Sequence, residues 1–313
     1  MRNDAGLERL ANDLGDIARR DVPIGPLTTY RVGGAASVYF EPATVADLER
    51  LSGALGGSGV RVLVLGNGSN LLVADAGWHG VCVHLGDAFS EIAIEGLEVT
   101  AGAATSYPVL ARRSAAAGLS GMEWAVGVPG SVGGAVRMNA GGHGSETRDR
   151  LGECRIIDLG TGEDRWWKPA DLHLSYRHSG LKEGQIVISA RYGLEQGDPA
   201  ESSEQINAIV RWRRANQPGG QNAGSVFTNP PGDSAGRLID AAGMKGVRVG
   251  TAMVSPKHAN FIQADPSGSA DDVRRLVDLV RETVAERLGV ELAIELQMVG
   301  WDPSPDRRDP PCS

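Results

Sequence analysis

Residues 127–142 constrain this chain more than any other stretch of its sequence. The segment reads GVPGSVGGAVRMNAGG, in which six residues are glycine and only Arg137 can carry charge. Each glycine inside a helix costs about 1 kcal/mol relative to alanine, so we do not expect an ordinary helix here. Dense glycine lets the backbone approach a bound phosphate or flat cofactor closely, with amide groups directed at it. We therefore expect a ligand-binding loop, with a purely structural glycine loop as the alternative.

The composition excludes several classes of protein. A length of 313 residues indicates two or three domains and allows a sizeable core. The net charge of −8 argues against nonspecific nucleic-acid binding. No stretch approaches the roughly 18 apolar residues of a membrane span, and the charged N-terminus does not resemble a signal peptide. The three cysteines and the histidines show no disulfide or metal-binding spacing. We expect a cytoplasmic protein that binds neither membrane, nucleic acid nor metal.

The first part of the chain predicts an α/β unit that ends in a second glycine loop. We expect extended chain over residues 29–40, a helix over residues 45–55 and a strand over residues 61–65. The loop GNGSN follows that strand at residues 66–70, where α/β folds commonly bind ligands. This loop lacks the third glycine of a dinucleotide fingerprint and the lysine of a P-loop, so a tight structural turn stays open.

Further periodic segments follow, and they suggest how the chain is divided. We expect strands over residues 97–101, 154–159 and 186–192, and helices over residues 109–117, 201–214 and 271–288. Ser269 and Asp272 have capping-box spacing before the last helix, and Gly289 follows it. Strict alternation of apolar and polar residues predicts a half-buried strand over residues 290–298. We expect domains over residues 1–85, 86–200 and 201–302, then a disordered tail over residues 303–313.

Three polar side chains are candidates for chemistry. Arg177 lies in the motif SYRHS, where a planar guanidinium can bind a carboxylate or an enolate. Ser225 follows Gly224 without forming the G-x-S-x-G motif of hydrolases, and it can donate a proton. Glu295 lies on the polar side of the last expected strand. Taken alone, each also fits a plainer interpretation: a surface arginine, a turn serine and a solvated carboxylate.

Seven motifs in this order resemble the UDP-N-acetylenolpyruvoylglucosamine reductase family. They are TYRVGG at 29–34, LGNGSNLLV at 65–73, the stretch 123–142, SYRHS at 175–179, NAGSVF at 222–227, SPKHANF at 255–261 and the stretch 291–300. The resemblance implies an α/β (α+β) fold, with a two-lobed FAD-binding region like that of vanillyl-alcohol oxidase and a C-terminal α+β substrate domain. The chain resembles the shorter class of the family, which lacks an extra substrate-covering insertion.

The resemblance also implies a reaction and its residues. NADPH would reduce FAD, which would then reduce a UDP-sugar enolpyruvyl ether. Apart from the resemblance, we expect a monomer. Arg177 and a protonated Glu295 would stabilise the enolate while Ser225 protonates it. The implied FAD-binding residues are Tyr30, Arg31, Gly66, Asn67, Gly68, Ser69, Asn70, Leu71, Gly127, Pro129, Gly130, Ser131, Gly133, Gly134, Ala135, Asn139, Ala140 and Gly141. We further expect substrate contacts from Tyr176, Arg213, Asn229, Arg237, His258 and Asn260.

Two alternatives remain at this point. One is an FAD-dependent oxidase on the same scaffold, which would need a different third domain. The other is a nucleotide-sugar binding protein without catalytic activity, which would not need a flavin.

Overall fold

The computed structural model of the chain describes residues 4–301, so the expected disordered tail at 303–313 lies outside the described residues. The chain forms two compact units, and each is discontinuous in sequence. Unit 1 comprises Met1–Val22, Ala36–Asn67 and His79–Ala215, and unit 2 comprises Pro23–Ala35, Gly68–Trp78 and Asn216–Ser313. Residues 85 and 86 both lie in unit 1. The expected boundary between two domains at residues 85 and 86 stays a prediction.

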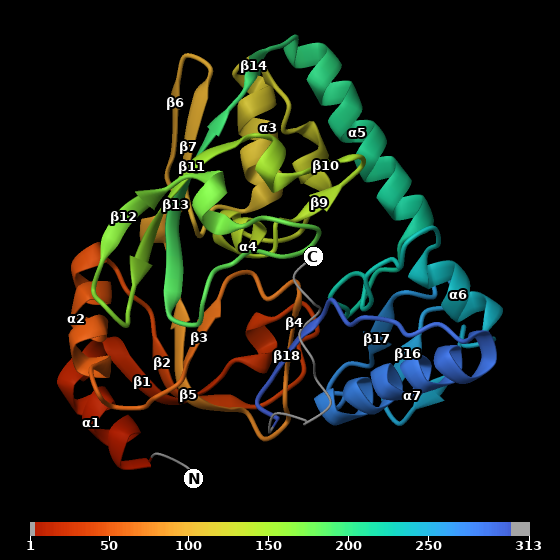
Figure 1. The fold of residues 1–313 in the computed structure, drawn as a ribbon, viewed down its shortest axis with the longest axis horizontal. Helices are drawn as coiled ribbons and strands as arrows, with labels where there is room; N and C mark the ends of the chain where they lie inside the picture. The colour runs from red at the N-terminus through yellow and green to blue at the C-terminus, as the bar shows by residue number, and fades with distance from the viewer. Residues whose placement is uncertain (1–3, 302–313) are drawn as a thin grey trace. The chain divides into compact units, whose positions relative to one another are not determined.

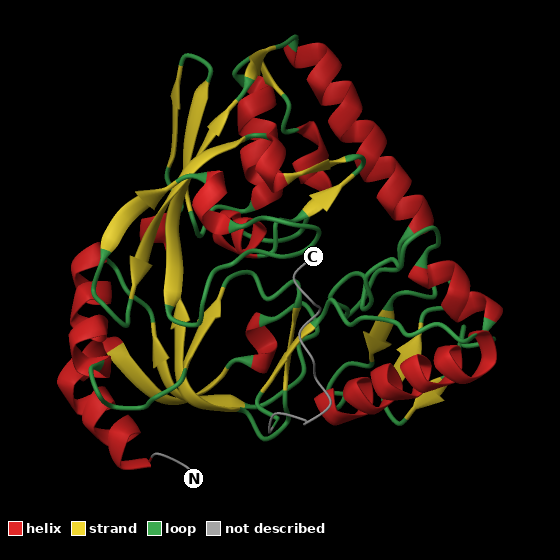
Figure 2. Ribbon diagram, viewed as in Figure 1, coloured by secondary structure: helices red, strands yellow, loops and turns green. Residues whose placement is uncertain are grey.

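Unit 1 contains two sheets that share one hydrophobic core (Figures 1 and 2). The core includes Phe40 and Val81 from the first sheet, and Ile156 and Ala190 from the second. The first sheet has the strand order β1 (Ala18–Pro23), β2 (Ala35–Phe40), β5 (Trp78–His84) and β3 (Val62–Leu65). The second is antiparallel, with the order β12 (Asp164–Trp167), β11 (Leu151–Asp158), β13 (Gln185–Gly193), β7 (Glu98–Gly102) and β6 (Ile92–Glu95).

Helices and two short strand pairs complete unit 1. Figure 1 shows α1 and α2 side by side. Helix α2 begins where Thr44 and Asp47 form a reciprocal capping box, and it buries Leu48 and Leu51. The helices are α1 (Asp4–Leu14), α2 (Val45–Leu55), α3 (Tyr107–Ala116), α4 (Val132–Arg137) and α5 (Pro199–Asn216). The strand pairs are β9 (Gly141–Gly142) with β10 (Ser145–Glu146), and β8 (Leu119–Ser120) with β14 (Glu195–Gln196).

Unit 2 is built around a long amphipathic helix. Helix α7 (Ala270–Leu288) buries Val273, Val277, Val280 and Val284 as its helical spacing predicts. The same core includes Tyr30 and Leu72, which come from the two short N-terminal segments of the unit. The other elements are α6 (Ala235–Ala241), the antiparallel sheet β15 (Arg248–Val249), β16 (Ala252–Val254) and β17 (Ile262–Ala264), and the parallel pair β4 (Leu71–Val73) and β18 (Gln297–Val299).

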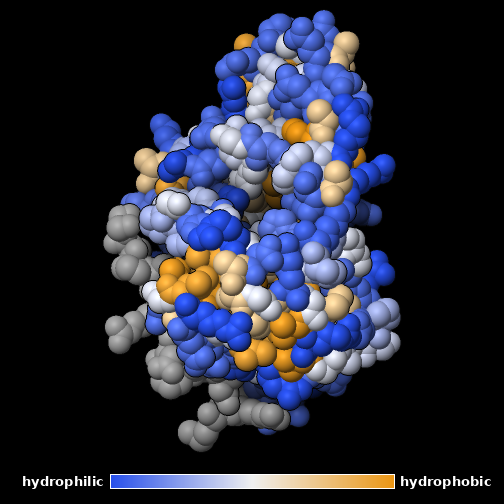
Figure 3. Space-filling model, turned by 90° about the vertical axis from the view of Figure 1, so that its right-hand side faces the viewer, coloured by the Kyte–Doolittle hydropathy of each residue, from blue (hydrophilic) through white to orange (hydrophobic). Residues whose placement is uncertain are grey.

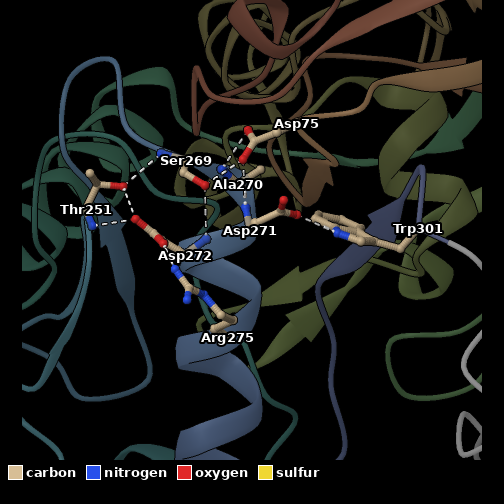
Figure 4. Close-up of polar contacts among 8 residues, drawn as sticks. All are labelled: Asp75, Thr251, Ser269, Ala270, Asp271, Asp272, Arg275 and Trp301. Atoms are coloured by element: carbon tan, nitrogen blue, oxygen red, sulfur yellow. Dashed lines mark hydrogen bonds and ion pairs between the residues drawn. The ribbon is translucent and has the colours of Figure 1, made fainter.

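The N-terminus of α7 is held by two caps (Figure 4). Ser269 Oγ accepts a hydrogen bond from the Asp272 amide, which confirms the predicted helix start. Asp75, from the loop after β4, accepts from Ser269 Oγ at 2.5 Å, from the Ala270 amide at 2.9 Å and from the Asp271 amide at 3.1 Å. A carboxylate at a helix N-terminus accepts hydrogen bonds from the free amides, and its negative charge interacts favourably with the positive end of the helix dipole. Asp75 thereby ties the β4 loop to α7.

The predicted capping box at Ser269 is only half formed. The Asp272 carboxylate accepts hydrogen bonds from the Thr251 amide at 2.7 Å and from Thr251 Oγ1 at 2.8 Å, and it also pairs with Arg275 (Figure 4). These partners replace the return bond to the Ser269 backbone. Trp301 Nε1 donates to Asp271 at 2.7 Å, so the first turn of α7 also binds the last described residue.

The strand predicted over residues 290–298 is wrong in extent. Leu292 and Leu296 are buried, as the alternation predicts, but regular pairing begins only in β18 (Gln297–Val299). Before it, the amides of Glu295 and Leu296 both donate to the carbonyl of Val226, which interrupts a regular ladder. Similarly, regular strand structure in the expected 29–40 stretch is limited to β2 (Ala35–Phe40).

On the face drawn in Figure 3, patches of hydrophobic surface lie among hydrophilic residues. On α7 the large exposed hydrophobic residues are Leu279 and Leu288. Among the helices of the described residues, none combines the length and apolar character that crossing a membrane requires.

A glycine in α2 gives a stability prediction. A Cβ added to Gly53 would meet no atom within 4 Å, so we expect Gly53→Ala to stabilise the protein by about 1 kcal/mol through its higher helix propensity. As a contrast, Gly33 has φ +108°, and a Cβ there would lie 2.2 Å from the Val73 carbonyl oxygen. We expect Gly33→Ala to destabilise by about 3 kcal/mol. Urea denaturation measures both, and equal midpoints for the two variants would contradict this account.

Candidate active site

The two predicted ligand loops meet in unit 1. A Cβ added to Gly66 would lie 2.5 Å from Ser131 Oγ, so only glycine allows this close approach. Ser131 in turn caps α4 by accepting from the Gly134 amide at 3.3 Å. The expectation that residues 127–142 contain no ordinary helix is therefore wrong for α4, since the cap and the burial of Val132 and Val136 outweigh its two glycines.

The amides of this region divide into bonded and available donors. The Val132 amide donates to the Thr105 carbonyl and the Gly133 amide to the Ala103 carbonyl, each at 2.9 Å. Within the described residues, the amides of Asn67, Gly130 and Ser131 donate to no protein group. Adjacent backbone amides with no internal acceptor fit the phosphates of a dinucleotide.

Arg177 occupies a strained two-residue turn. Ser175 and His178 exchange two backbone hydrogen bonds of 3.1 Å, and Arg177 between them has φ +57°. A non-glycine residue in this conformation is uncommon and often marks a functional site. The Arg177 guanidinium stacks 4.9 Å from the Tyr176 ring centre and donates to the Gly141 carbonyl at 2.8 Å. The structure thus places Arg177 against the end of the glycine segment.

Two more bonds fasten the Arg177 turn to the glycine segment. Asn139 Nδ2 donates to the Ser175 carbonyl at 2.9 Å, while its Oδ1 accepts from the Arg148 amide. Ser179 Oγ donates to the Arg137 carbonyl at 2.6 Å. Asn139 is fully buried, so its side chain joins the glycine segment to the Arg177 turn inside the protein. Its expected contact with FAD stays a prediction.

Ser225 and Glu295 lie on neighbouring segments of unit 2. The Val226 carbonyl, one residue after Ser225, accepts from the Glu295 amide at 2.9 Å and from the Leu296 amide at 3.3 Å. Phe227 and Ile294 form an isolated antiparallel bridge beside these bonds. Both Ser225 and Glu295 are half-buried, which suits groups that contact a small-molecule substrate.

The end of the 66–70 loop lies against Glu295. Asn70 Nδ2 donates to the Glu295 carbonyl at 3.1 Å, and the Asn70 carbonyl accepts from the Gln297 amide at 3.1 Å. The parallel pair of β4 and β18 continues directly from these bonds. Within unit 2 the structure therefore brings together Asn70, Glu295 and the Ser225 segment, which are far apart in sequence.

The predicted substrate contacts fall into different surroundings. Arg237 pairs with Asp233, and Asn229 Oδ1 accepts from the Ala235 amide at the start of α6. The His258 ring lies 4.8 Å from that of Phe261. Burial, followed by the charge of Lys245, lowers the pKa of His258.

The remaining predicted residues include both buried and exposed side chains. Asn260 uses both of its amide atoms on the backbone of Phe227. Tyr30 is fully buried, and its hydroxyl donates to the Ile262 carbonyl at 3.0 Å. Its side chain is therefore part of the core of unit 2. In unit 1, burial lowers the pKa of Arg213, and Tyr176 is about half exposed.

One group beside the glycine segment was not expected from the sequence. His143, just after the segment, has its ring 5.3 Å from that of Trp212, and burial lowers its pKa, with the charge of Arg213 adding to the effect. His143 also lines a cavity of ≈ 340 Å³ in unit 1 together with Glu123 and Arg150. In the sequence His143 directly follows the glycine segment, within GGHG, and that position was the available signal.

These features define a class of protein, an FAD-binding oxidoreductase with a separate C-terminal domain. Residues 36–166 match the family model described as "FAD binding domain", and residues 214–299 match "UDP-N-acetylenolpyruvoylglucosamine reductase, C-terminal domain". The chain belongs to the UDP-N-acetylenolpyruvoylglucosamine reductase family. The predicted α+β fold with an FAD-binding region and a distinct C-terminal domain is confirmed, as is its class, flavin-dependent oxidoreductase.

Similar proteins span nearly the whole chain. A UDP-N-acetylenolpyruvoylglucosamine reductase of Rubrobacter xylanophilus is 41% identical over 306 residues, covering 95% of this chain and 99% of the relative. That of Acidiphilium cryptum is 44% identical over 281 residues, covering 90% of each. The crystal structure of the reductase from Thermus caldophilus has a TM-score of 0.79 and 37% identity, covering 90% of this chain and 100% of that one.

The close approach of Gly66 to Ser131 predicts a specific loss of cofactor affinity. In Gly66→Ala the new methyl group displaces the Ser131 hydroxyl, which weakens the α4 cap and shifts the adjacent free amides. We expect the Kd for FAD to rise about tenfold, measured by flavin fluorescence. Gly193→Ala is the matched control, since Gly193 is exposed outside the glycine segment and a Cβ there meets no atom within 4 Å. Equal FAD affinity in both variants would show that the 66–67 loop does not bind the cofactor.

Proposed function

We propose that this chain reduces UDP-N-acetylglucosamine enolpyruvate to UDP-N-acetylmuramate, with FAD as cofactor and NADPH as reductant, in peptidoglycan precursor synthesis. The relatives named above support the reaction, and their similarity covers both matched domains. The observation that carries the proposal is the Val226 carbonyl, which fixes the backbone of Glu295 beside the segment of Ser225. A proton donor and a charge-stabilising carboxyl are what reduction of an enolpyruvyl double bond requires.

The proposed reaction adds a hydride to C3 and a proton to C2 of the enolpyruvyl group. FAD, when bound, supplies the two-electron hydride chemistry that links NADPH to the substrate. As C3 gains the hydride, negative charge develops at C2 and on the adjoining carboxylate. Arg177 would bind that carboxylate through its planar guanidinium, and a protonated Glu295 would donate a hydrogen bond to it. Each such donor contributes about 3–4 kcal/mol to transition-state stabilisation.

Ser225 would complete the reaction as the proton donor. Its Oγ–H bond breaks as a C–H bond forms at C2, and solvent returns the proton to the serine. An alcohol is a weak acid, but a developing carbanion is a strong enough base to take its proton. The half-buried position of Ser225 is suited to contact with the substrate.

The FAD pyrophosphate would be held by backbone amides of unit 1. The free amides of Asn67, Gly130 and Ser131 are the donors that support this assignment. Arg137 is the only residue of the 127–142 segment that carries charge, and it donates to the carbonyl of Lys182 at 3.2 Å and to that of Leu181. Neutral donors, rather than lysines, would therefore stabilise the cofactor's phosphates.

We place the reaction in the cytoplasm and assign a UDP-sugar as the small-molecule partner. Cys82 and Cys154 are free and buried, and burial raises the pKa of each thiol to about 12. Unpaired thiols of this kind suit a reducing compartment. The monomeric state expected from the sequence stays a prediction, which light scattering tests.

Product analysis in heavy water tests the proposed function. With FAD, NADPH and the enolpyruvyl UDP-sugar in D₂O, we expect UDP-N-acetylmuramate that carries a solvent-derived deuterium at C2. An oxidase on the same scaffold would instead reduce oxygen with an alcohol substrate and leave the enolpyruvyl group intact. A protein that only binds nucleotide sugars would consume no NADPH. Either result would overturn the proposal.

A further inference from the structure

The side-chain amide of buried Asn260 forms two hydrogen bonds with the backbone of Phe227, two residues after Ser225. It pairs with that backbone as the peptide group of a neighbouring strand would. Asn260 Oδ1 accepts from the Phe227 amide at 3.0 Å, and Asn260 Nδ2 donates to the Phe227 carbonyl at 2.8 Å. The Asn260 carbonyl also accepts from the Val226 amide at 2.9 Å. Asn260 is 3% exposed and Phe227 1% exposed, so water cannot replace these bonds.

The opposite edge of the same short segment is bonded to the Glu295 backbone. The Val226 carbonyl accepts from the Glu295 amide, and the Thr228 amide donates to the Ala293 carbonyl, each at 2.9 Å. The residues that follow Ser225 are therefore held from both sides. Without the Asn260 side chain, the buried amide and carbonyl of Phe227 would lose their partners, and this segment would have to shift to find others.

We propose that Asn260 is a positioning residue that fixes the Ser225 hydroxyl relative to Glu295 by bonding the Phe227 backbone, and that it does not bind substrate. The inference rests on the proposed function, because Ser225 is the proton donor only in that reaction. Asn260 is 3% exposed and both of its amide atoms bond the Phe227 backbone, so little of the side chain is open to a substrate. A displacement of about 1 Å at a reacting group can cost about a hundredfold in rate, so such a clamp affects turnover.

Asn260→Asp tests the proposal because the protonation state of the new carboxyl decides whether both hydrogen bonds to the Phe227 backbone can form. A protonated carboxyl has the shape of the amide: its O–H can donate to the Phe227 carbonyl while its other oxygen accepts from the Phe227 amide. The ionised form has no donor and places negative charge against that carbonyl. Burial raises the pKa of the introduced carboxyl above its unfolded value, so the stability it contributes is lost as pH rises through the folded pKa.

Stopped-flow measurement of the FAD-loaded variant separates the two half-reactions. We expect flavin reduction by NADPH at the wild-type rate at both about pH 5 and about pH 8. Reoxidation by the enolpyruvyl UDP-sugar should fall about threefold at the lower pH and about thirtyfold at the higher pH. At the higher pH the D₂O isotope effect on reoxidation should exceed that of the wild type, because transfer of the serine proton becomes slower.

Two readouts do not depend on turnover. Relative to the wild type, the Tm of Asn260→Asp should fall by about 5 °C more at about pH 8 than at about pH 5. Asn12→Asp is the matched control, since Asn12 is exposed on α1 and its variant should show no such dependence. Hydrogen exchange at the Phe227 amide of the wild-type holoenzyme should be slow. Rapid exchange there would overturn the proposal even if the variant does not fold.

Other outcomes of the same experiments are decisive. Wild-type reoxidation by Asn260→Asp at the higher pH would overturn the proposal, as would an equal loss in both half-reactions with an unchanged isotope effect. If the wild-type flavin is not reoxidised by the enolpyruvyl UDP-sugar, the proposed function fails instead. In that case, the exchange and Tm measurements still report on the bond between Asn260 and Phe227.

Discussion

Ser225→Ala is expected to slow flavin reoxidation by the enolpyruvyl UDP-sugar by about two to three orders of magnitude while leaving flavin reduction by NADPH unchanged. The reason is chemical, since alanine has no proton to give to C2, whereas the reduction of FAD by NADPH needs none from Ser225. The backbone around the site should persist, because the bonds of Val226 to Asn260 and Glu295 involve main-chain atoms. Anaerobic stopped-flow absorbance measures the two steps separately.

Ser203→Ala controls for the loss of a hydroxyl as such. Ser203 is exposed on α5, and we expect both half-reactions of its variant to keep their wild-type rates. Reoxidation of Ser225→Ala within about threefold of the wild type would remove the serine from the mechanism. An equal loss in reduction and reoxidation would point to a disturbed cofactor site.

Arg177→Lys is expected to slow reoxidation by about a hundredfold, although the charge is kept. Lysine cannot bind a carboxylate with two parallel hydrogen bonds, and it cannot reproduce both the stacking on Tyr176 and the bond to the Gly141 carbonyl. We expect a lower rate at saturating substrate as well as weaker substrate binding. The dependence of the reoxidation rate on substrate concentration measures both effects.

Arg165→Lys is the matched control for Arg177→Lys. Arg165 also stacks on an aromatic ring, 4.7 Å from the Trp167 ring centre, and pairs with Glu163 on an exposed strand. Its replacement should leave both half-reactions unchanged. If Arg177→Lys behaves in the same way as this control, the guanidinium does not stabilise the developing charge.

Local sequence patterns predicted the elements whose stabilising contacts are close in sequence. Helix α7 follows from its apolar spacing, and Ser269 and Gly289 form its caps, with Gly289 at φ +68°. Helix α2 follows in the same way from its apolar spacing, with Leu48 and Leu51 buried. The strand predicted over 290–298 shortened to β18 because its hydrogen-bond partners, Val226 and β4, lie far away in the sequence.

The glycine content of residues 127–142 gave a wrong prediction for α4, where no ordinary helix was expected. Two glycines within α4 lower helix propensity, but Ser131 caps the helix and the Val132 and Val136 side chains are buried. Tertiary packing thus overrides a local preference that was correctly derived. No pattern in the sequence indicated that Asp75 would cap α7 from 195 residues away.

In the candidate site too, local motifs predicted some residues, while features that depend on tertiary contacts could not be predicted. Motif resemblance selected Arg177, Ser225 and Glu295, and their roles stay predictions that the experiments above test. The sequence could not show that Asn260 has both amide atoms occupied by Phe227, because those partners are 33 residues apart. It also could not show that Arg177 adopts a left-handed conformation at φ +57°. Such facts depend on tertiary contacts rather than on spacing.

An anaerobic titration of the FAD-bound protein, followed by flavin absorbance, tests whether the chain reduces the enolpyruvyl UDP-sugar with electrons from NADPH. One equivalent of NADPH should bleach the flavin, and one equivalent of UDP-N-acetylglucosamine enolpyruvate should then restore its colour with formation of UDP-N-acetylmuramate. A flavin that NADPH bleaches but the enolpyruvyl sugar nucleotide leaves reduced would contradict the assigned reaction. A chain that stays colourless after purification and does not take up added FAD would contradict the flavin site itself.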